Sequence, residues 1–438
     1  MKVAFHTLGC KVNQYETEEL LEKFKNAGYD IVSETSAADI YVINTCTVTS
    51  IADRKSRQYI RKMKKISPNS LICVMGCYAQ ISSEELISMP EADIVLGNGE
   101  KQELLKYIDL YKGEKICHIL EYDELNKYTD KGIICSMEGK NRAYIKIEEG
   151  CNRFCSYCLI PFARGKVRSR DPKEVVLEAK TLIDKGFKEL VLTGINTALY
   201  GTEEGFNEKY QIDINGLEYI IREINSIPGE FRIRLSSLEP TVVNSIYVKN
   251  LLKYEKLCHH LHLSIQAGSD KVINLMNRSY TRDEYLDIVK VLREFDPYYG
   301  ITTDIIVGFS GESEGDFLDS LDVVKKAKFL KVHVFKYSKR KGTRGYNMPS
   351  EVSPEIKNER SDRLISLSND VSKKFLEEQI GSVRTVLFEE GENEISGYTD
   401  SYIKVYAKKN SEKDLNSFRK VKLLKVYKDG MKGEIVNE

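Results

Sequence analysis

The chain has 438 residues, 41% of them hydrophobic, and its 66 basic side chains (Lys and Arg) equal its 66 acidic ones (Asp and Glu). That length predicts two to four domains at roughly 100–200 residues per domain and excludes one small domain, while zero net charge means that any affinity for nucleic acid must come from local patches. No run approaches the ~18 apolar residues of a membrane span and the N-terminus lacks a signal peptide, so we expect a globular, cytoplasmic protein without a membrane partner.

Residues 1–112 alternate short β-rich runs with amphipathic stretches. The β-rich runs lie at residues 2–10, 39–46, 70–77 and 92–97, and the amphipathic stretches at 15–27, 50–66, 83–89 and 100–111. This alternation predicts βαβ units and therefore a doubly wound parallel sheet. Cys10, Cys46 and Cys77 each stand at the carboxyl end of a predicted strand. Because such strand ends meet at one edge of the sheet, the three thiols can converge there.

A connecting segment near residues 112–136 leads into a second alternating series, over residues 137–366. Its strands are predicted at residues 142–150, 188–196, 231–239, 260–268, 301–309 and 330–338, with helical stretches between them. Six βα units, each followed by polar or glycine-rich sequence, predict a partial (β/α)6 barrel whose site lies on the C-terminal face. A full eight-unit barrel needs two more strands, and the sequence offers none.

The last part of the chain changes character. Residues 354–376 form one charged amphipathic stretch, predicted to be a connecting helix, and residues 372–438 include short alternating strands separated by turn residues. A small antiparallel β-barrel is the expected fold of this region. The whole chain is thus predicted to be an α/β protein of three domains.

Cys151, Cys155 and Cys158 form a CxxxCxxC motif directly after a predicted strand. Three thiolates on one loop can hold a single metal centre, but a structural zinc site needs four ligands. An iron–sulfur cluster held by three cysteines leaves one iron open for a substrate or cofactor, which suits a catalytic centre. Two alternatives remain open: a zinc site completed by a distant residue such as Cys135 or His262, or thiols that simply pack in a core.

The stretch GCNRFCSYC at residues 150–158 resembles the cluster loop of the radical S-adenosylmethionine (SAM) enzymes. In that superfamily three cysteines bind a 4Fe–4S cluster, and the open iron chelates the amino and carboxylate groups of SAM. The resemblance implies that Tyr157 lies near the adenine of SAM, although this ring could instead pack the loop.

Three segments of the first domain, TLGCKVNQYETE, NTCTVT and VMGCYAQ, resemble the cysteine segments of the methylthiotransferases. Those enzymes bind a second 4Fe–4S cluster, which the resemblance places on Cys10, Cys46 and Cys77. The residues alone also allow three buried thiols, because cysteine is among the most buried residue types. The other cysteines match no family position and are assigned to packing: Cys73, Cys117, Cys135 and Cys258.

Four strand ends of the barrel, TGINTALYG, RLSSLEP, HLSIQAGSD and TDIIVGFSGES, resemble the cofactor-facing segments of this family. The resemblance implies that their small or polar residues face the ribose and methionine parts of SAM: Gly194, Asn196, Ser236, Ser237, Gln266 and Asp304. Each could instead be an ordinary turn or cap residue. Ser310 stands where this family usually has proline, a departure that bears on the stiffness of that loop.

Two basic runs, at residues 53–65 and 336–344, stand out on the neutral chain, and residues 404–432 hold ten basic against three acidic side chains with aromatic residues between them. Such runs are most often solvated faces, yet basic and aromatic side chains together suit phosphate contact and base stacking. The C-terminal region resembles the TRAM domain, an RNA-binding barrel.

The resemblance spans nearly the whole chain, in the order auxiliary-cluster domain, radical barrel and TRAM domain, and TLGCKVN resembles the subgroup that acts on N6-threonylcarbamoyladenosine in transfer RNA. It implies a transferase that adds a methylthio group to this nucleoside beside the anticodon. The implied cofactors are two 4Fe–4S clusters and SAM, with an electron donor such as flavodoxin or ferredoxin. An aromatic C–H bond has no useful acidity, so the reaction needs a cofactor radical. The single-stranded anticodon loop can present its base to a pocket.

The threonyl carboxylate of that substrate brings a negative charge, so we expect an arginine to reach it. The candidates at the C-terminal face of the barrel are Arg164, Arg168, Arg340 and Arg344, although an exposed arginine is most often only solvated. Two other functions stay open. One is a relative that acts on isopentenyladenosine or on a ribosomal protein, and the other is a non-catalytic iron–sulfur regulator that binds RNA.

Overall fold

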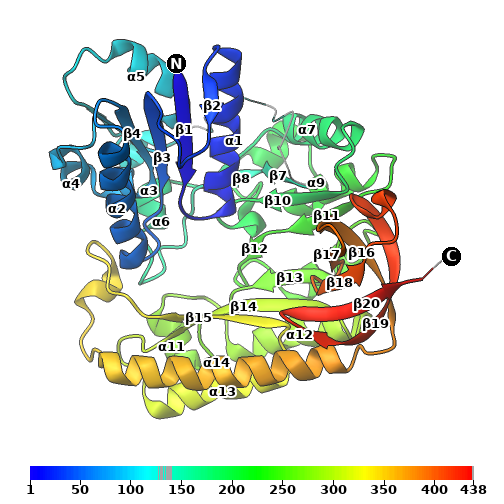
Figure 1. Ribbon diagram of the computed structural model, residues 1–438. Coiled ribbons are helices and arrows are strands. Elements are labelled where there is room, and N and C mark those ends of the chain that lie inside the picture. Colours follow the sequence, from blue (N-terminus) through cyan, green and yellow to red (C-terminus); the bar gives the residue numbers. More distant parts are fainter. Residues whose placement is uncertain (127, 129–131, 133, 135–140, 437–438) are drawn as a thin grey trace.

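The computed structural model describes residues 1–126, 128, 132, 134 and 141–436, and its first unit is a parallel sheet flanked by helices (Figure 1). The strand order is β2-β1-β3-β4-β5-β6. The strands are β1 (Lys2–Thr7), β2 (Asp30–Val32), β3 (Ile40–Thr45), β4 (Leu71–Gly76), β5 (Ile94–Leu96) and β6 (Ile116–His118). The helices are α1 (Lys11–Asn26), α2 (Ser50–Ile66), α3 (Cys77–Ile81), α4 (Ser83–Ser88) and α5 (Leu104–Leu110), with 3-10 turns η1 (Lys101–Glu103) and η2 (Tyr122–Glu124).

The doubly wound sheet agrees with the sequence prediction, but the sequence pattern did not predict three elements of this unit, β2, β6 and α3. The strands β2 and β6 have three residues each, too few for an alternating pattern to stand out, and α3 begins at Cys77 with no residue separating it from β4. Because β6 pairs with β5, the sheet extends beyond the boundary expected at residue 112. The strand order reverses between β1 and β3, which is where open α/β sheets place their ligand sites.

The second unit is a partial barrel of parallel strands. One sheet has the order β11-β10-β7 and a second the order β12-β13-β14-β15, and Ser236 alone separates β11 from β12. The strands are β7 (Arg142–Lys146), β10 (Glu189–Thr193), β11 (Arg232–Leu235), β12 (Ser237–Leu238), β13 (His260–Leu263), β14 (Gly300–Val307) and β15 (Lys331–Lys336). A short ribbon of β8 (Glu148–Glu149) and β9 (Arg168–Ser169) flanks the cysteine loop. The six strand positions predicted from the sequence are therefore all occupied.

Helices cover the outer face of this barrel, where alternate apolar residues of the strands, such as Leu261 and Leu263, join one large core. The helices are α6 (Ile160–Arg164), α7 (Pro172–Asp184), α8 (Phe206–Tyr210), α9 (Gly216–Asn225), α10 (Ser245–Leu251), α11 (Asp270–Leu275), α12 (Arg282–Phe295), α13 (Glu314–Ala327) and the connecting α14 (Pro354–Glu377), with 3-10 turns η3 (Thr197–Leu199) and η4 (Arg344–Asn347). Among the described residues, no helix combines the length and apolar character needed to cross a bilayer.

The third unit is a closed five-stranded barrel with the order β16-β17-β18-β20-β19. Its strands are β16 (Val383–Glu390), β17 (Glu394–Thr399), β18 (Lys404–Lys408), β19 (Ser417–Tyr427) and β20 (Gly430–Ile435), with a 3-10 turn η5 (Glu412–Asp414). All of its pairings are antiparallel except that of β18 with β20. The small barrel predicted from the alternating C-terminal strands is therefore present.

This third unit packs against the starts of the radical-barrel strands. Arg232 donates to the Tyr398 carbonyl at 3.0 Å, and Arg234 donates to the Asp400 carbonyl at 3.0 Å. A Cβ on Gly300 would lie 2.0 Å from the Ser401 carbonyl oxygen, so only glycine allows this close approach. Removing the C-terminal barrel would expose these buried groups, so surface substitutions are the cleaner way to test its role.

Candidate active site

The three cysteines of the first sheet lie together beside the reversal of strand order. Cys10 follows β1, Cys46 follows β3, and Cys77 begins α3 directly after β4. A Cβ on Gly9, whose φ is +114°, would sit 2.8 Å from the Cys46 Cβ, so the two loops touch and only glycine fits between them. Burial, together with the neighbouring Cys77 and Cys10 thiols, raises the pKa of Cys46 to about 12. Their role as cluster ligands stays a prediction.

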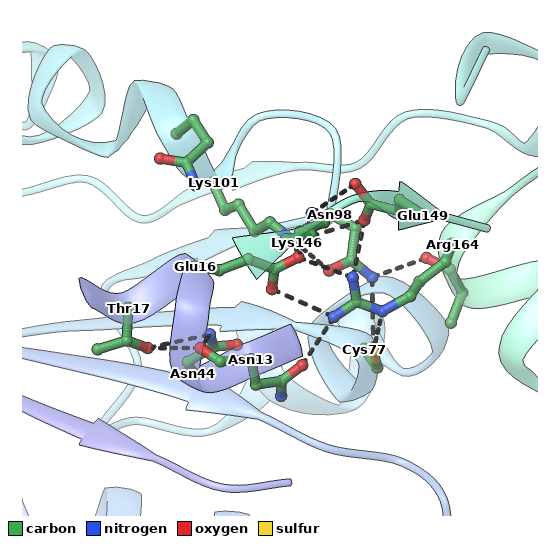
Figure 2. A network of polar contacts seen from close by, with 12 residues as sticks. Asn13, Glu16, Thr17, Asn44, Cys77, Asn98, Lys101, Lys146, Glu149 and Arg164 are labelled. Atoms are coloured by element: carbon green, nitrogen blue, oxygen red, sulfur yellow. Dashed lines mark hydrogen bonds and ion pairs between the residues drawn. The ribbon is translucent and has the colours of Figure 1, made fainter. Parts of the chain in front are cut away.

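Arg164, at the end of α6, reaches from the barrel to this first triad (Figure 2). Its side chain is fully buried. Its Nε donates to Cys77 Sγ at 3.2 Å, and the rest of the guanidinium donates to Glu16 at 2.7 Å, Glu149 at 2.8 Å and Asn13 at 2.7 Å. Arg164 therefore connects the helix that follows the barrel's cysteine loop with a cysteine of the first sheet.

Two buried lysines complete a charge network around this guanidinium. Lys101 Nζ lies 2.6 Å and Lys146 Nζ lies 2.8 Å from a Glu16 carboxylate oxygen, with side chains that are fully buried. Burial alone would raise the pKa of Glu16, but the charges of Arg164 and the two lysines hold it well below its usual range. Glu149 is the second carboxylate of this network, and Arg168 Nη2 also lies 3.6 Å from it. Buried charges are costly unless they are paired, so these ion pairs hold the groups around Cys77 in place.

Cys151, Cys155 and Cys158 lie on the loop between β8 and α6, at the carboxyl end of the first barrel strand. Backbone hydrogen bonds hold this loop, because Cys151 N donates to the Gly165 carbonyl at 3.0 Å and Ser156 N donates to the Met276 carbonyl, also at 3.0 Å. Burial, and then the neighbouring Cys155 thiol, raises the pKa of Cys158 to about 12. The motif thus presents three half-buried thiols on one fixed loop.

The spacing of the sulfur atoms bears on the zinc alternative. Within the part of the chain that the structure describes, neither triad gathers its three sulfurs within 4.8 Å of one another. Four-coordinate zinc, with Zn–S bonds of about 2.3 Å, needs sulfurs about 3.8 Å apart, a spacing that neither triad has here. Cys135 lies outside the described residues. Cys73 and Cys258 are buried and Cys117 is exposed.

A charged frame that the sequence analysis missed connects two of the predicted cofactor residues. Glu239, just after β12, accepts a hydrogen bond from Asn196 Nδ2 at 2.9 Å and pairs with Arg278. Arg278 in turn donates to the Tyr157 hydroxyl at 2.7 Å. Glu239 ends a predicted strand, so a search of the strand ends could have identified it. Arg278 follows the helix α11 and stands at no strand end, so the same search could not have identified it.

Glu148 is a second residue that the sequence analysis missed. A Cβ on Gly194 would lie 2.5 Å from its carboxylate, and Asn196 N donates to the same group at 3.0 Å. Burial raises the pKa of Glu148 to about 8, so this carboxyl group is mostly protonated at neutral pH. In the sequence, the pair of adjacent glutamates just before Cys151 could have pointed to Glu148 as a site residue.

The remaining predicted cofactor residues stand at neighbouring strand ends. Ser236 and Ser237 occupy the break between β11 and β12, where the Ser236 hydroxyl accepts a hydrogen bond from Thr193 at 3.4 Å. Gln266 adopts a left-handed φ of +68°, which is costly outside glycine, and its backbone N donates to the Asp304 carbonyl at 2.9 Å. Their contacts with SAM stay a prediction.

Three of the four arginines expected to meet the substrate are engaged within the protein. Arg164 makes the buried hydrogen bonds to Cys77, Glu16 and Glu149 described above. Arg168 is buried and donates to three backbone carbonyls. Arg340 lies 2.7 Å from Asp53 on α2 and so links the barrel to the first sheet. Their contact with the substrate stays a prediction, and these contacts between domains could not be read from the local sequence. Arg344 is exposed and stays a candidate.

The basic stretches on α2 and β19 form exposed surfaces. On α2 the exposed basic residues are Arg54, Lys55, Arg61, Lys62 and Lys65, and on β19 they are Lys420, Lys422 and Lys425. A groove of about 250 Å³ beside α2 is lined by His6, Leu8, Lys55, Gln58, Tyr59 and Lys62. Exposed cations next to aromatic rings suit a nucleic-acid backbone.

Two family models match the chain: the uncharacterized protein family UPF0004 over residues 2–97 and the Radical SAM superfamily over residues 145–324. The threonylcarbamoyladenosine tRNA methylthiotransferase MtaB of Bacillus subtilis (strain 168) is 40% identical, covering 100% of this chain and 97% of its own. Its namesake from Aquifex aeolicus (strain VF5) is also 40% identical, covering 91% and 96%. A tRNA-2-methylthio-N(6)-dimethylallyladenosine synthase of Clostridium novyi (strain NT) is 34% identical, covering 87% and 84%.

Among solved structures, the radical S-adenosylmethionine methyltransferase TsrM from Kitasatospora setae, with cobalamin and a 4Fe–4S cluster bound, matches with a TM-score of 0.56. The alignment covers 88% of this chain and 80% of that chain. Sequence identity is 12%, so this likeness concerns the fold alone.

Proposed function

Because this chain belongs to the threonylcarbamoyladenosine tRNA methylthiotransferase family of radical SAM enzymes, we propose that it adds a methylthio group to N6-threonylcarbamoyladenosine beside the anticodon of transfer RNA. The observation that carries the proposal is 40% identity over the full chain to a relative named for that reaction. The relative named for the dimethylallyl substrate is less similar, at 34% identity.

The superfamily brings one 4Fe–4S cluster and SAM, and Cys151, Cys155 and Cys158 would hold that cluster. We assign a second cluster to the triad of Cys10, Cys46 and Cys77, an assignment that the hydrogen bond from Arg164 Nε to Cys77 Sγ at 3.2 Å supports. When bound, the clusters and SAM supply a radical and a sulfur atom, chemistry that no positioned acid or base can perform on an aromatic C–H bond.

The chain's own residues bind and orient the reactants. Glu239 and Arg278 next to the barrel's cysteine loop offer charges of both signs, which suits the ammonium and carboxylate groups of SAM. Glu148, mostly protonated at neutral pH, offers a hydrogen-bond donor without a charge. Arg164 and Arg340 connect the first sheet to the barrel, so both triads belong to one fixed frame. Reductive chemistry also needs an outside electron donor, such as flavodoxin or ferredoxin.

The substrate assignment is tested with reconstituted enzyme and three anticodon stem-loops that carry adenosine, isopentenyladenosine or threonylcarbamoyladenosine. We expect kcat/KM for the third to exceed the others by at least about 100-fold, because a site built for polar groups rejects analogues that lack them. Mass spectrometry of the nucleosides measures the product. Preference for isopentenyladenosine, or equal turnover of adenosine, would move the enzyme to another methylthiotransferase subgroup. RNA binding without SAM cleavage would instead favour a non-catalytic iron–sulfur regulator that binds RNA.

The third unit and α2 are proposed to bind the transfer RNA backbone. Replacing Lys420, Lys422 and Lys425 together by Gln should weaken RNA binding and lower the salt dependence of log Kd, by about 0.7–0.9 for each phosphate that a lysine no longer neutralises. The matched control replaces three exposed lysines on the outer helices α7 and α10, Lys173, Lys180 and Lys249, and should leave the slope unchanged. Equal slopes for both triple variants in a filter-binding titration would place the RNA elsewhere.

A further inference from the structure

Three metal-ligating side chains outside both cysteine triads gather on the inner face of the barrel sheet. We call His262, Asp304 and His333 the inner-face cluster. The two ring nitrogens and the carboxylate oxygen that they offer all lie within 4.8 Å of one another. His262 Nε2 lies 3.1 Å from Asp304 Oδ2. Imidazole nitrogens and a carboxylate oxygen are ligands with which proteins bind divalent transition metals such as zinc and ferrous iron.

Adjoining strands of the barrel hold the inner-face cluster in place. His262 lies on β13, Asp304 on β14 and His333 on β15, and the register of β14 with β15 sets Asp304 directly beside His333. Neighbouring strands lie about 4.8 Å apart, so side chains on the same face of adjacent strands can reach one ion. Ligands on strands are also positioned more precisely than ligands on loops, which favours a defined coordination geometry.

The inner-face cluster is accessible to an ion. Successive side chains of a strand point to opposite faces, and Leu261 and Leu263, which point to the helices, are at most 1% exposed. The side chains of His262 and Asp304 keep 15% and 26% exposure on the other face. Barrels of parallel strands bind their ligands toward the carboxyl ends of these strands, and Ser264 follows directly on β13. The cluster therefore lies on the side of the sheet where a ligand enters.

Hydrogen bonds from neighbouring residues orient two of the three side chains. The Thr302 hydroxyl lies 2.9 Å from His262 Nδ1 and 3.1 Å from His260 Nε2. This hydroxyl can accept from Nδ1–H of His262 while it donates to His260, which leaves the Nε2 lone pair of His262 directed toward Asp304. The Ser264 hydroxyl donates to Asp304 Oδ2 at 2.9 Å. Metal-binding histidines and carboxylates usually have such outer partners, which fix the direction of the ligand atoms.

His333 offers the third ligand atom. Its side chain is half-buried, and neither ring nitrogen hydrogen-bonds any residue that the structure describes. Its ring centroid lies 5.9 Å from that of His262 with the planes tilted by 55°, so the two rings are not stacked. A half-buried imidazole on a polar face is costly without a partner for its nitrogens. A metal ion bound between the three side chains would supply that partner.

The distances within the cluster fit a single ion. Bonds of about 2.0–2.1 Å from zinc to nitrogen and oxygen place tetrahedral ligand atoms about 3.4 Å apart. The 3.1 Å between His262 Nε2 and Asp304 Oδ2 is close to this value. The nitrogen of His333, within 4.8 Å of both, needs to move by no more than about 1.5 Å, which a small side-chain rotation provides. Magnesium and calcium prefer oxygen ligands, so two imidazoles favour a transition metal.

We propose that the inner-face cluster binds one divalent transition-metal ion, zinc or ferrous iron, through His262 Nε2, a ring nitrogen of His333 and the Asp304 carboxylate. This ion is separate from the clusters assigned to the two cysteine triads. Three protein ligands leave at least one coordination position open toward the barrel interior, as in catalytic metal sites. The assignment gives Asp304 to the ion in place of the SAM contact that the family resemblance implies.

The test counts the zinc bound to full-length, anaerobically reconstituted enzyme after equilibrium dialysis against zinc chloride, with iron and acid-labile sulfide measured in the same samples. Wild type should bind about one zinc per chain without losing cluster iron. Asp304→Asn and His333→Phe should lose this zinc and keep their iron and sulfide. Thr302→Val should weaken the zinc Kd about 10- to 100-fold, as expected for an outer partner. The matched control is His118→Phe, an exposed histidine outside the cluster, which should bind zinc like wild type.

X-ray absorption at the zinc edge provides a second measurement that needs no variant. Nitrogen and oxygen ligands at about 2.0–2.1 Å would support the site, whereas sulfur at about 2.3 Å would place the zinc on cysteine and overturn it. Zinc retained at the wild-type level by both Asp304→Asn and His333→Phe would also overturn it. So would a wild type with neither one zinc nor one iron in excess of sulfide. Excess iron of one atom per chain, lost in His333→Phe, would support the site with ferrous iron as its ion.

Discussion

Replacing Cys151, Cys155 and Cys158 together by alanine is expected to abolish reductive cleavage of SAM and to halve the bound iron. Two clusters of four irons predict about eight iron atoms per reconstituted chain and about four in this variant. The same triple substitution at Cys10, Cys46 and Cys77 should also leave about four, but it should retain SAM cleavage and lose methylthio transfer. Iron analysis, the yield of 5′-deoxyadenosine and the modified nucleoside measure the three effects.

Two other cysteines provide the control for these variants. Cys117 is exposed and Cys73 is buried in the first sheet, and neither lies in a triad, so alanine at either position should keep the full iron content. Cleavage of SAM that survives the loss of the barrel triad would mean that the roles of the two triads are wrongly assigned. Tightly bound zinc at one equivalent, with little iron, would overturn the cluster assignment.

Replacing Arg164 by methionine is expected to cost about 3–5 kcal/mol of unfolding free energy, because removing one partner leaves buried charges poorly compensated. The guanidinium contacts Glu16, Glu149 and Cys77 at 2.7, 2.8 and 3.2 Å, and methionine replaces none of these hydrogen bonds. Loss of the N–H to sulfur hydrogen bond should also lower the reduction potential of a cluster bound there, since hydrogen bonds to the sulfurs help set that potential. Denaturant unfolding and an EPR-monitored redox titration measure the two effects.

An exposed arginine supplies the comparison for that variant. Arg61 on α2 has a side chain that is 58% exposed and a weak 4.0 Å pairing with Glu91, so Arg61→Met should change stability by no more than about 0.5 kcal/mol. Arg164→Lys retains the positive charge but loses the planar guanidinium group and its several N–H donors. It should therefore recover only part of the unfolding free energy that Arg164→Met loses. If Arg164→Met unfolds like Arg61→Met, the buried network does not hold the domains together. An unchanged redox potential would show that Arg164 does not affect the cluster.

The sequence predicted the parts of this protein that depend on local pattern. Alternating strands and helices indicated the parallel sheet and the six-unit barrel, and the C-terminal alternation indicated the small closed barrel, because hydrophobic periodicity is a local property. The CxxxCxxC motif needs only neighbouring residues, so its loop was found directly. The short strands β2 and β6 were missed because three residues are too few to show the alternation of apolar and polar side chains that marks a strand.

Only the tertiary structure decided what the charged residues do. Arg164 contacts Cys77 across 87 positions of sequence, and Arg340 contacts Thr47 across 293 positions. An arginine in a sequence is by default an exposed cation, and its burial is tolerated only when partners from another unit neutralise it. The sequence therefore determined the family, the fold and the cysteine motifs. Packing between the domains determined which cations are buried in ion pairs, because burial and charge compensation arise only when distant segments meet.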